Sequence, residues 1–197
     1  MAEYDSRAAL LVVDVQNDFA DPSGSLSVRG GADLVPLLNA EIRKARDAGA
    51  AVIYTQDWHP PSTPHFAKDG GTWPVHCIAD TWGAAFHPDL AVVGPSVRKG
   101  SNGEDGYSGF TMRDPVTMME RPTELEAMLR QGGIERVVIG GLATDYCVRA
   151  TALDAMDRGL SVAVLADAVA AVDLQPGDGA RALAEVTAAG ADLTTTG

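Results

Sequence analysis

Short, continuous apolar runs alternate along this chain with longer segments in which apolar residues recur every three or four positions. The runs have the length of strands and are rich in β-branched residues, and they occupy residues 8–13, 51–56, 136–142 and 161–167. Such runs are typical of strands that are buried on both faces of a sheet. A last short strand is expected near residues 192–195.

The segments with helical spacing lie between these runs, at residues 32–50, 122–133, 144–159 and 178–190. Gly49 suits a C-terminal cap and Pro122 suits a first turn, while Thr144 or Asp145 would cap the third helix. Strands that alternate with helices predict right-handed crossovers. We therefore predict an α/β fold, a Rossmann-like three-layer arrangement with a mostly parallel β-sheet and helices on both faces. The chain shows no internal repeat and no linker, so we expect a single domain over residues 1–197.

Two segments do not follow this alternation. Residues 57–90 are rich in Gly, Pro, Trp and His and show no clear period. A connection of this length inside a compact domain is usually functional. Residues 90–100 are expected to be mostly extended, and Pro95 argues against a central, fully paired strand there.

Composition and charge exclude several classes of partner. The 197-residue chain carries a formal net charge of −12 and has no cluster of Lys and Arg, so a nucleic-acid partner is not expected. It begins without a signal-peptide pattern and has no apolar run long enough for a membrane helix. We therefore expect a cytoplasmic protein that keeps Cys77 and Cys147 as separate thiols. Homo-oligomerisation stays open.

Three reactive side chains follow predicted strands. In a parallel sheet the ligand site lies beyond the carboxyl ends of the strands. Asp14 closes the first strand, Lys99 precedes a glycine turn, and Cys147 stands in the first turn of a predicted helix, where a thiol is expected to be more acidic than usual. Taken singly, they also suit a strand-closing polar residue, a solvated charge and a buried small hydrophobe. Together they supply a base, a cation and a nucleophile for attack on an acyl carbon.

The stretch "DWHPPSTPHF" places Asp57, His59 and His65 in one proline-rich loop. These are ordinary loop residues, and they are also ligand types for a divalent metal ion. The residues alone do not decide between these interpretations.

Motifs across nearly the whole chain carry a family resemblance. They are "LLVVDVQNDF", a lysine before a glycine, "GGLATDYCVRATA" and "LADAVAA". With them the chain resembles the isochorismatase-like cysteine hydrolases and, among these, the nicotinamidase/pyrazinamidase branch. The resemblance implies that Asp14, Lys99 and Cys147 are catalytic.

The same resemblance implies a metal centre. Its ligands fall on Asp57, His59, His65 and on His76 in "WPVHC". One divalent ion per chain is implied; zinc is the favoured choice, and iron and manganese accept the same ligands. His87 has no matching ligand role and is interpreted as structural.

The resemblance also implies a pocket and its backbone. Phe19, Trp73, Tyr107 and Leu142 would line the substrate pocket, where a flat heteroaromatic ring could stack. Backbone N–H groups of Ala143 and Cys147 would form the oxyanion hole. Members of the family also carry a cis peptide at the position of Leu142–Ala143.

The implied activity is hydrolysis of nicotinamide to nicotinate and ammonia, with pyrazinamide as a second substrate. One alternative is another cysteine amidohydrolase that acts on a carbamoyl or ureido substrate, for which the metal ligands would not be needed. The other, from a different class, is an inactive binding or sensor protein on the same scaffold.

Overall fold

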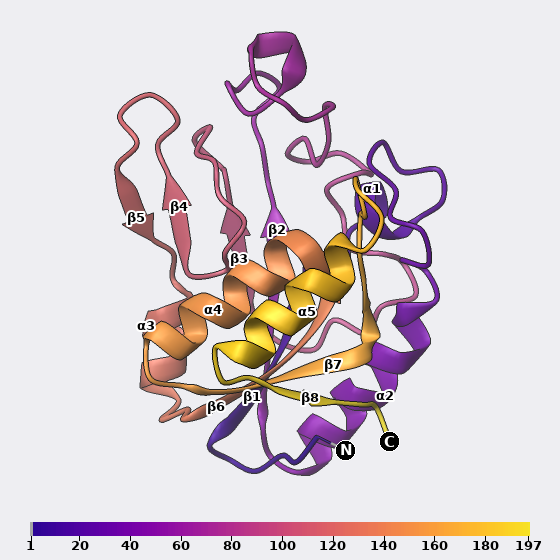
Figure 1. The fold of residues 1–197 in the computed structure, drawn as a ribbon, viewed down its shortest axis with the longest axis vertical. Helices are drawn as coiled ribbons and strands as arrows, with labels where there is room; N and C mark the ends of the chain where they lie inside the picture. Colours follow the sequence, from indigo (N-terminus) through magenta and orange to yellow (C-terminus); the bar gives the residue numbers. More distant parts are fainter. Residues whose placement is uncertain (1) are drawn as a thin grey trace.

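The computed structural model describes residues 2–197 and is built around a six-stranded sheet in which every neighbouring pair of strands is parallel (Figure 1). The strand order is β3-β2-β1-β6-β7-β8. The predicted fold class is therefore confirmed. The strands of this sheet are β1 (Ala8–Val13), β2 (Ala51–Asp57), β3 (Ser96–Lys99), β6 (Arg136–Leu142), β7 (Ser161–Ala170) and β8 (Asp192–Thr194).

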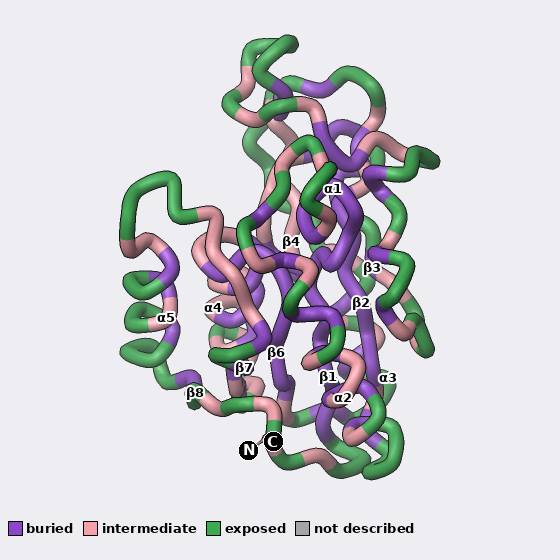
Figure 2. The backbone as a smooth tube through the Cα atoms, turned by 90° about the vertical axis from the view of Figure 1, so that its right-hand side faces the viewer, coloured by how far each residue is buried: buried purple, intermediate pink, exposed green. Residues whose placement is uncertain are grey.

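Strand β1 at the centre shows why the apolar runs form this sheet. All six of its residues are fully buried. Its side chains alternate between the two faces, so that Leu10 and Val12 join one core cluster while Leu11 and Val13 join the other. An uninterrupted apolar run satisfies both faces at once, and Figure 2 shows the buried strands at the centre of the molecule.

Helices cover both faces of the sheet, as predicted. Helix α2 packs on one face, and α3, α4 and α5 pack on the other. No helix among residues 2–197 is long and apolar enough to cross a bilayer. The helices are α1 (Asn17–Ala20), α2 (Leu34–Asp47), α3 (Leu125–Gln131), α4 (Arg149–Asp157) and α5 (Asp178–Ala188), with a short 3-10 turn η1 (Ala67–Asp69) and a π-helical turn η2 (Thr144–Val148).

The prediction for residues 122–133 is wrong at its start. Pro122 does not open helix α3, because it lies in an antiparallel hairpin of β4 (Thr111–Arg113) and β5 (Glu120–Pro122), where it pairs with Thr111. The helix begins after Glu124 instead. The hairpin was not predicted, since its strands have only three residues each, too few for a strand pattern to stand out.

The predicted caps of the helix that carries Cys147 are also wrong. The capping position is Ala143, and neither Thr144 nor Asp145 caps the turn with its side chain. The Asp145 carboxylate instead accepts the backbone N–H groups of Val172 and Asp173. The first five residues form a π-helical turn, a form that is frequent at functional sites.

The parallel arrangement gathers the site at one edge of the sheet. Strands β1, β2, β3 and β6 end there, and the long connection after β2 rises above that edge (Figure 1). Strand β3 lies at the edge of the sheet, where it pairs with β2, and it directly follows Pro95, so the expectation that this segment is not a central strand is confirmed.

Gly141 gives a test of this packing. Its φ is +121°, and an added Cβ would lie 2.1 Å from the Val13 carbonyl oxygen, part of the β1 backbone that cannot move aside. Gly141→Ala should lower the free energy of unfolding by about 3 kcal/mol or more. The control is Gly49→Ala, where φ is +76° and the space is open, so only the conformational cost of about 1–2 kcal/mol applies. Equal urea midpoints for the two variants would contradict the close approach of β1 and β6.

Candidate active site and metal centre

Asp14 stands directly after β1 and is 1% exposed. Its backbone is left-handed, with φ +49°, so the chain turns sharply as the strand ends. The Thr55 hydroxyl donates a hydrogen bond to Asp14 Oδ1 at 2.6 Å. Burial raises the pKa of Asp14, although the Lys99 ammonium opposes this. The carboxylate is therefore a stronger base than an exposed one.

Lys99, the last residue of β3, is 1% exposed and faces two carboxylates. Its Nζ lies 2.7 Å from Asp14 Oδ2, 2.8 Å from Asp57 Oδ1 and 3.6 Å from Cys147 Sγ. Burial lowers the pKa of Lys99, but the two carboxylates and the sulfur raise it, and the net direction is upward. The side chain is therefore a cation at neutral pH.

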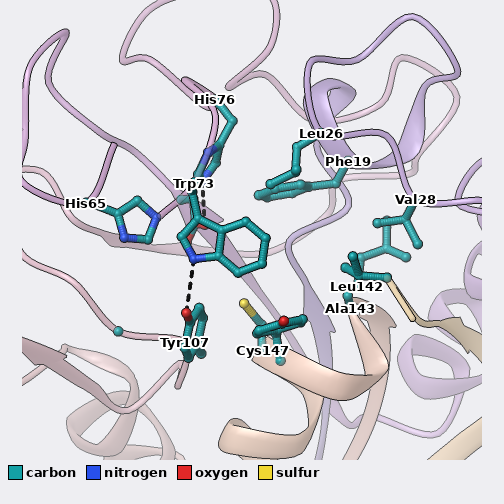
Figure 3. A pocket seen from close by; sticks show the side chains of 14 residues that line it. Phe19, Leu26, Val28, His65, Trp73, His76, Tyr107, Leu142, Ala143 and Cys147 are labelled. Atoms are coloured by element: carbon teal, nitrogen blue, oxygen red, sulfur yellow. Dashed lines mark hydrogen bonds and ion pairs between the residues drawn. The ribbon is translucent and has the colours of Figure 1, made fainter. Parts of the chain in front are cut away.

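Cys147 lies in η2, is 7% exposed and points its sulfur into a pocket (Figure 3). Burial raises the pKa of the thiol, Lys99 opposes this shift, and Asp14 adds to it. The expectation of an unusually acidic thiol is therefore corrected, because loss of solvation outweighs the effect of the helix start. At rest the proton stays on sulfur, so reaction requires a base to remove it.

Three histidines converge beside this group. Ligand nitrogens of His59, His65 and His76 all lie within 4.8 Å of one another. Asp57 Oδ2 lies 3.8 Å from His59 Nε2 and 3.9 Å from His76 Nε2. Both ring nitrogens of His59 are buried without a hydrogen-bond partner among the described residues. Such orphaned nitrogens are costly unless something binds them, so this donor set fits a divalent metal ion.

The other two rings are held from outside. His76 Nδ1 lies 2.7 Å from the Pro74 carbonyl oxygen and His65 Nδ1 lies 2.8 Å from Asp105 Oδ1. Because these oxygens accept, each Nδ1 carries the proton and each Nε2 keeps its lone pair. Burial lowers the pKa of His76 to about 4, although Asp57 opposes the shift, so this ring is neutral and able to ligate at neutral pH.

The pocket above Cys147 is lined by Phe19, Trp73, Tyr107 and Leu142, the side chains that the sequence suggested. His65 and His76 lie on the side away from Leu142, and the Phe19 ring packs against the His76 ring with centroids 5.4 Å apart (Figure 3). The Trp73 indole donates a hydrogen bond to the Tyr107 hydroxyl at 3.0 Å. The peptide Leu142–Ala143 is cis, as the resemblance implied.

Part of this lining was not predicted from the sequence. Tyr146 packs edge-on against Trp73 and Tyr107, with ring centroids 5.0 and 5.2 Å away. It is the residue directly before Cys147, so its position in that motif was a usable signal. The remaining missed residues are Leu26, Val28, Gly106 and Val172, which come from loops whose sequence carries no periodic pattern.

Gln16 was also missed, and it joins the two halves of the site. Its side-chain amide donates to the Asp57 carbonyl oxygen at 2.7 Å and accepts the Asp57 N–H at 2.8 Å. It also donates to the Ala84 carbonyl oxygen at 2.9 Å. The segment after β1 is thereby fixed against the end of β2.

Two residues stay outside the site, as interpreted from the sequence. The His87 Nδ1 accepts the backbone N–H of Asp89 at 3.3 Å, away from the histidine cluster. Cys77 is a free, fully buried thiol, and so is not joined to Cys147 by a disulfide.

Comparison with known proteins gives a consistent result. Residues 8–197 match the family model described as the isochorismatase domain. A nicotinamidase of Escherichia coli (strain K12) is 38% identical over 205 residues, an alignment that covers 95% of this chain and 94% of the relative.

Two solved structures share the fold closely. The pyrazinamidase of Pyrococcus horikoshii in complex with zinc is 40% identical, with a TM-score of 0.86, over 96% of this chain and 99% of that one. A protein of L. infantum named PnC1, solved in complex with nicotinate, is 34% identical, with a TM-score of 0.88, over 98% of this chain and 96% of that one.

Asp14→Asn should make the Cys147 thiol more acidic while it removes the carboxylate that serves as the base. The substitution removes a negative charge that raises the pKa of Cys147, so the pKa of the thiol should fall. Alkylation by iodoacetamide should then reach its half-maximal rate at a lower pH than in the wild type. The same measurement on Cys147→Ala gives the background rate at which Cys77 is alkylated. A midpoint that is unchanged or higher in Asp14→Asn would contradict the assigned charge arrangement.

Proposed function

The chain belongs to the isochorismatase family. The reaction that its site supports best is the hydrolysis of nicotinamide to nicotinate and ammonia, and we propose below how the residues of the site carry it out. The protein is an amidohydrolase that acts on nicotinamide. We extend the same chemistry to pyrazinamide, because it is also a carboxamide on a small, flat heteroaromatic ring.

One observation carries the proposal. The sulfur of Cys147 opens into a pocket with aromatic walls, while a histidine cluster lies on the pocket's other side (Figure 3). A ring bound between these two features has its carboxamide at the sulfur and its ring nitrogen at the histidines. The intact group of Asp14, Lys99 and Cys147 argues against an inactive binding protein.

The first half of the reaction uses the three buried side chains. Asp14 accepts the proton of the Cys147 thiol, and the sulfur attacks the carboxamide carbon. Lys99, 3.6 Å from the sulfur and 2.7 Å from Asp14, remains protonated and stabilises the thiolate as it forms. Asp14 then gives its proton to the departing nitrogen, so that ammonia leaves and a thioester remains on Cys147.

The backbone and a water molecule complete the cycle. The N–H groups of Ala143 and Cys147 receive the oxyanion, a contribution of about 3–4 kcal/mol for each well-placed donor. Asp14 next accepts a proton from water, whose oxygen attacks the thioester carbon. The C–S bond breaks, the proton returns to sulfur, and nicotinate is released.

The metal centre orients the substrate in this proposal. His59, His65, His76 and Asp57 would hold one divalent ion, which we assign as zinc, with iron and manganese as ions that the same ligands accept. When bound, the ion offers a Lewis-acid position to the pyridine nitrogen of the substrate. The same ligands argue against a carbamoyl or ureido substrate, which has no ring nitrogen to place there.

The function is tested by measuring ammonia release from purified protein supplied with nicotinamide. Nicotinate should appear in equal amount. A protein that carries its metal and releases no ammonia from nicotinamide would overturn the proposal.

Cys147→Ala should abolish turnover and leave the fold intact, since a small apolar side chain suits this buried position. The matched control is Cys77→Ala, which removes the other buried thiol and should keep the activity. Mass spectrometry of the wild type quenched during turnover should find a nicotinoyl adduct on Cys147. More than a tenth of wild-type activity in Cys147→Ala would rule out the covalent route.

Removal of the metal ion by a chelator should lower the turnover of nicotinamide but leave the Cys147 thiol reactive. Stripped protein should lose most of its activity towards nicotinamide, while Cys147 stays open to alkylation, because Lys99, 3.6 Å from its sulfur, stays in place without the metal. His59→Ala should resemble the stripped protein, since loss of one ligand weakens a small donor set greatly. His87→Ala, a buried histidine outside the cluster, should behave as wild type. Full turnover in protein shown by elemental analysis to hold no metal would contradict the ligand assignment.

A further inference from the structure

The three histidines of the cluster are not supported alike. His76 is held through its Nδ1 by a backbone carbonyl, that of Pro74. His59 packs its ring against the backbone of Gly100, where an added Cβ would lie 2.5 Å from Nδ1. His65 alone of the three is held by a charged side chain, through the 2.8 Å contact between its Nδ1 and Asp105 Oδ1.

Asp105 is itself held rigidly by the hairpin. Its N–H donates to the Arg113 carbonyl oxygen at 2.7 Å, and the Arg113 N–H donates back to the Asp105 carbonyl oxygen at 2.6 Å. The N–H of Gly106 donates to the same Oδ1 that contacts His65, at 2.8 Å. Asp105 Oδ1 is therefore held in position by the backbone, independently of its contact with the His65 imidazole.

The position of Asp105 argues for action through His65 rather than on the substrate. Asp105 does not line the pocket, whereas its two successors, Gly106 and Tyr107, do. Its other charged neighbour is Arg113, whose Nη2 lies 3.9 Å from Oδ2 with the arginine side chain 43% exposed. A long, exposed ion pair of this kind contributes little, so His65 is the main partner of the carboxylate.

We propose that Asp105 is a positioning residue that fixes the tautomer and the rotation of His65, and so sets the affinity of the histidine cluster for its metal ion. A carboxylate only accepts here, so Nδ1 must keep the proton and Nε2 must offer its lone pair to the cluster. The carboxylate of Asp105 also makes the His65 imidazole more basic, so that its Nε2 binds a metal ion more strongly. This inference rests on the proposed metal centre and deepens it.

The test measures metal affinity without turnover. Stripped proteins are titrated with Zn²⁺ against a chromophoric chelator, which reports the dissociation constant of each variant. Asp105→Ala should weaken Zn²⁺ binding about 10- to 100-fold, the range typical of lost outer partners of a metal ligand. Asp105→Asn should lose less, because its amide oxygen can accept the same two protons, from His65 and Gly106.

Asp114→Ala is the matched control. Asp114 lies at the turn of the same hairpin, where its carboxylate accepts the N–H groups of Val116 and Thr117. This variant should bind Zn²⁺ as the wild type does. Thermal unfolding of each metal-free variant is measured alongside, and Asp105→Asn serves as the decisive variant if Asp105→Ala does not fold.

The outcomes separate this inference from the metal centre on which it rests. Wild-type affinity in both Asp105 variants would overturn the positioning role and leave the metal centre standing. Equal weakening in Asp105→Ala and Asp114→Ala would also overturn it, because the effect would then belong to the hairpin as a whole. A wild-type protein with no measurable affinity for Zn²⁺ would overturn the metal centre itself.

Discussion

The rest of the site depends on the buried ion pairs that the Lys99 ammonium group forms with the carboxylates of Asp14 and Asp57. Two carboxylates this close in a medium of low dielectric would repel each other, and one would take up a proton. The cation between them opposes this by favouring the charged form of each, so one can act as a base and the other as a ligand. Removing one partner of such a buried group usually costs about 3–5 kcal/mol, which makes the lysine a structural requirement as well as a chemical one.

The sheet supplies this arrangement from simple ingredients. Parallel strands all end at one edge, so a single reactive residue placed at the end of each of several strands is sufficient to build a cluster. Asp14, Asp57 and Lys99 stand at the ends of the neighbouring strands β1, β2 and β3, and η2 with Cys147 follows the end of β6. Gln16 then fixes the register between two of these ends through both polar groups of the Asp57 backbone.

Much of this architecture could be predicted from the sequence, because buried parallel strands leave continuous apolar runs and helices leave a period. The edges of elements were less predictable. Pro122 was assigned to a helix because proline suits a first turn. The residues around it do not reveal that it pairs with a three-residue strand earlier in the chain. The acidity of Cys147 was misjudged for a similar reason. A helix start can be read in the sequence, whereas the loss of water around a side chain depends on everything packed over it. Asp105 lies 40 positions from His65, and no local pattern joins them.

The wide spacing of the site along the chain has a consequence for the life of the protein before it is folded. Lys99 and the three side chains around it come from positions 14, 57, 99 and 147, so no short fragment contains the site. Contacts of such long range form only once most of the topology is in place. A nascent or proteolysed chain therefore carries an ordinary, unassisted cysteine at position 147. The hydrolytic site comes into being only with the completed molecule, so an incomplete chain carries the cysteine without the base, the cation and the pocket that turnover needs.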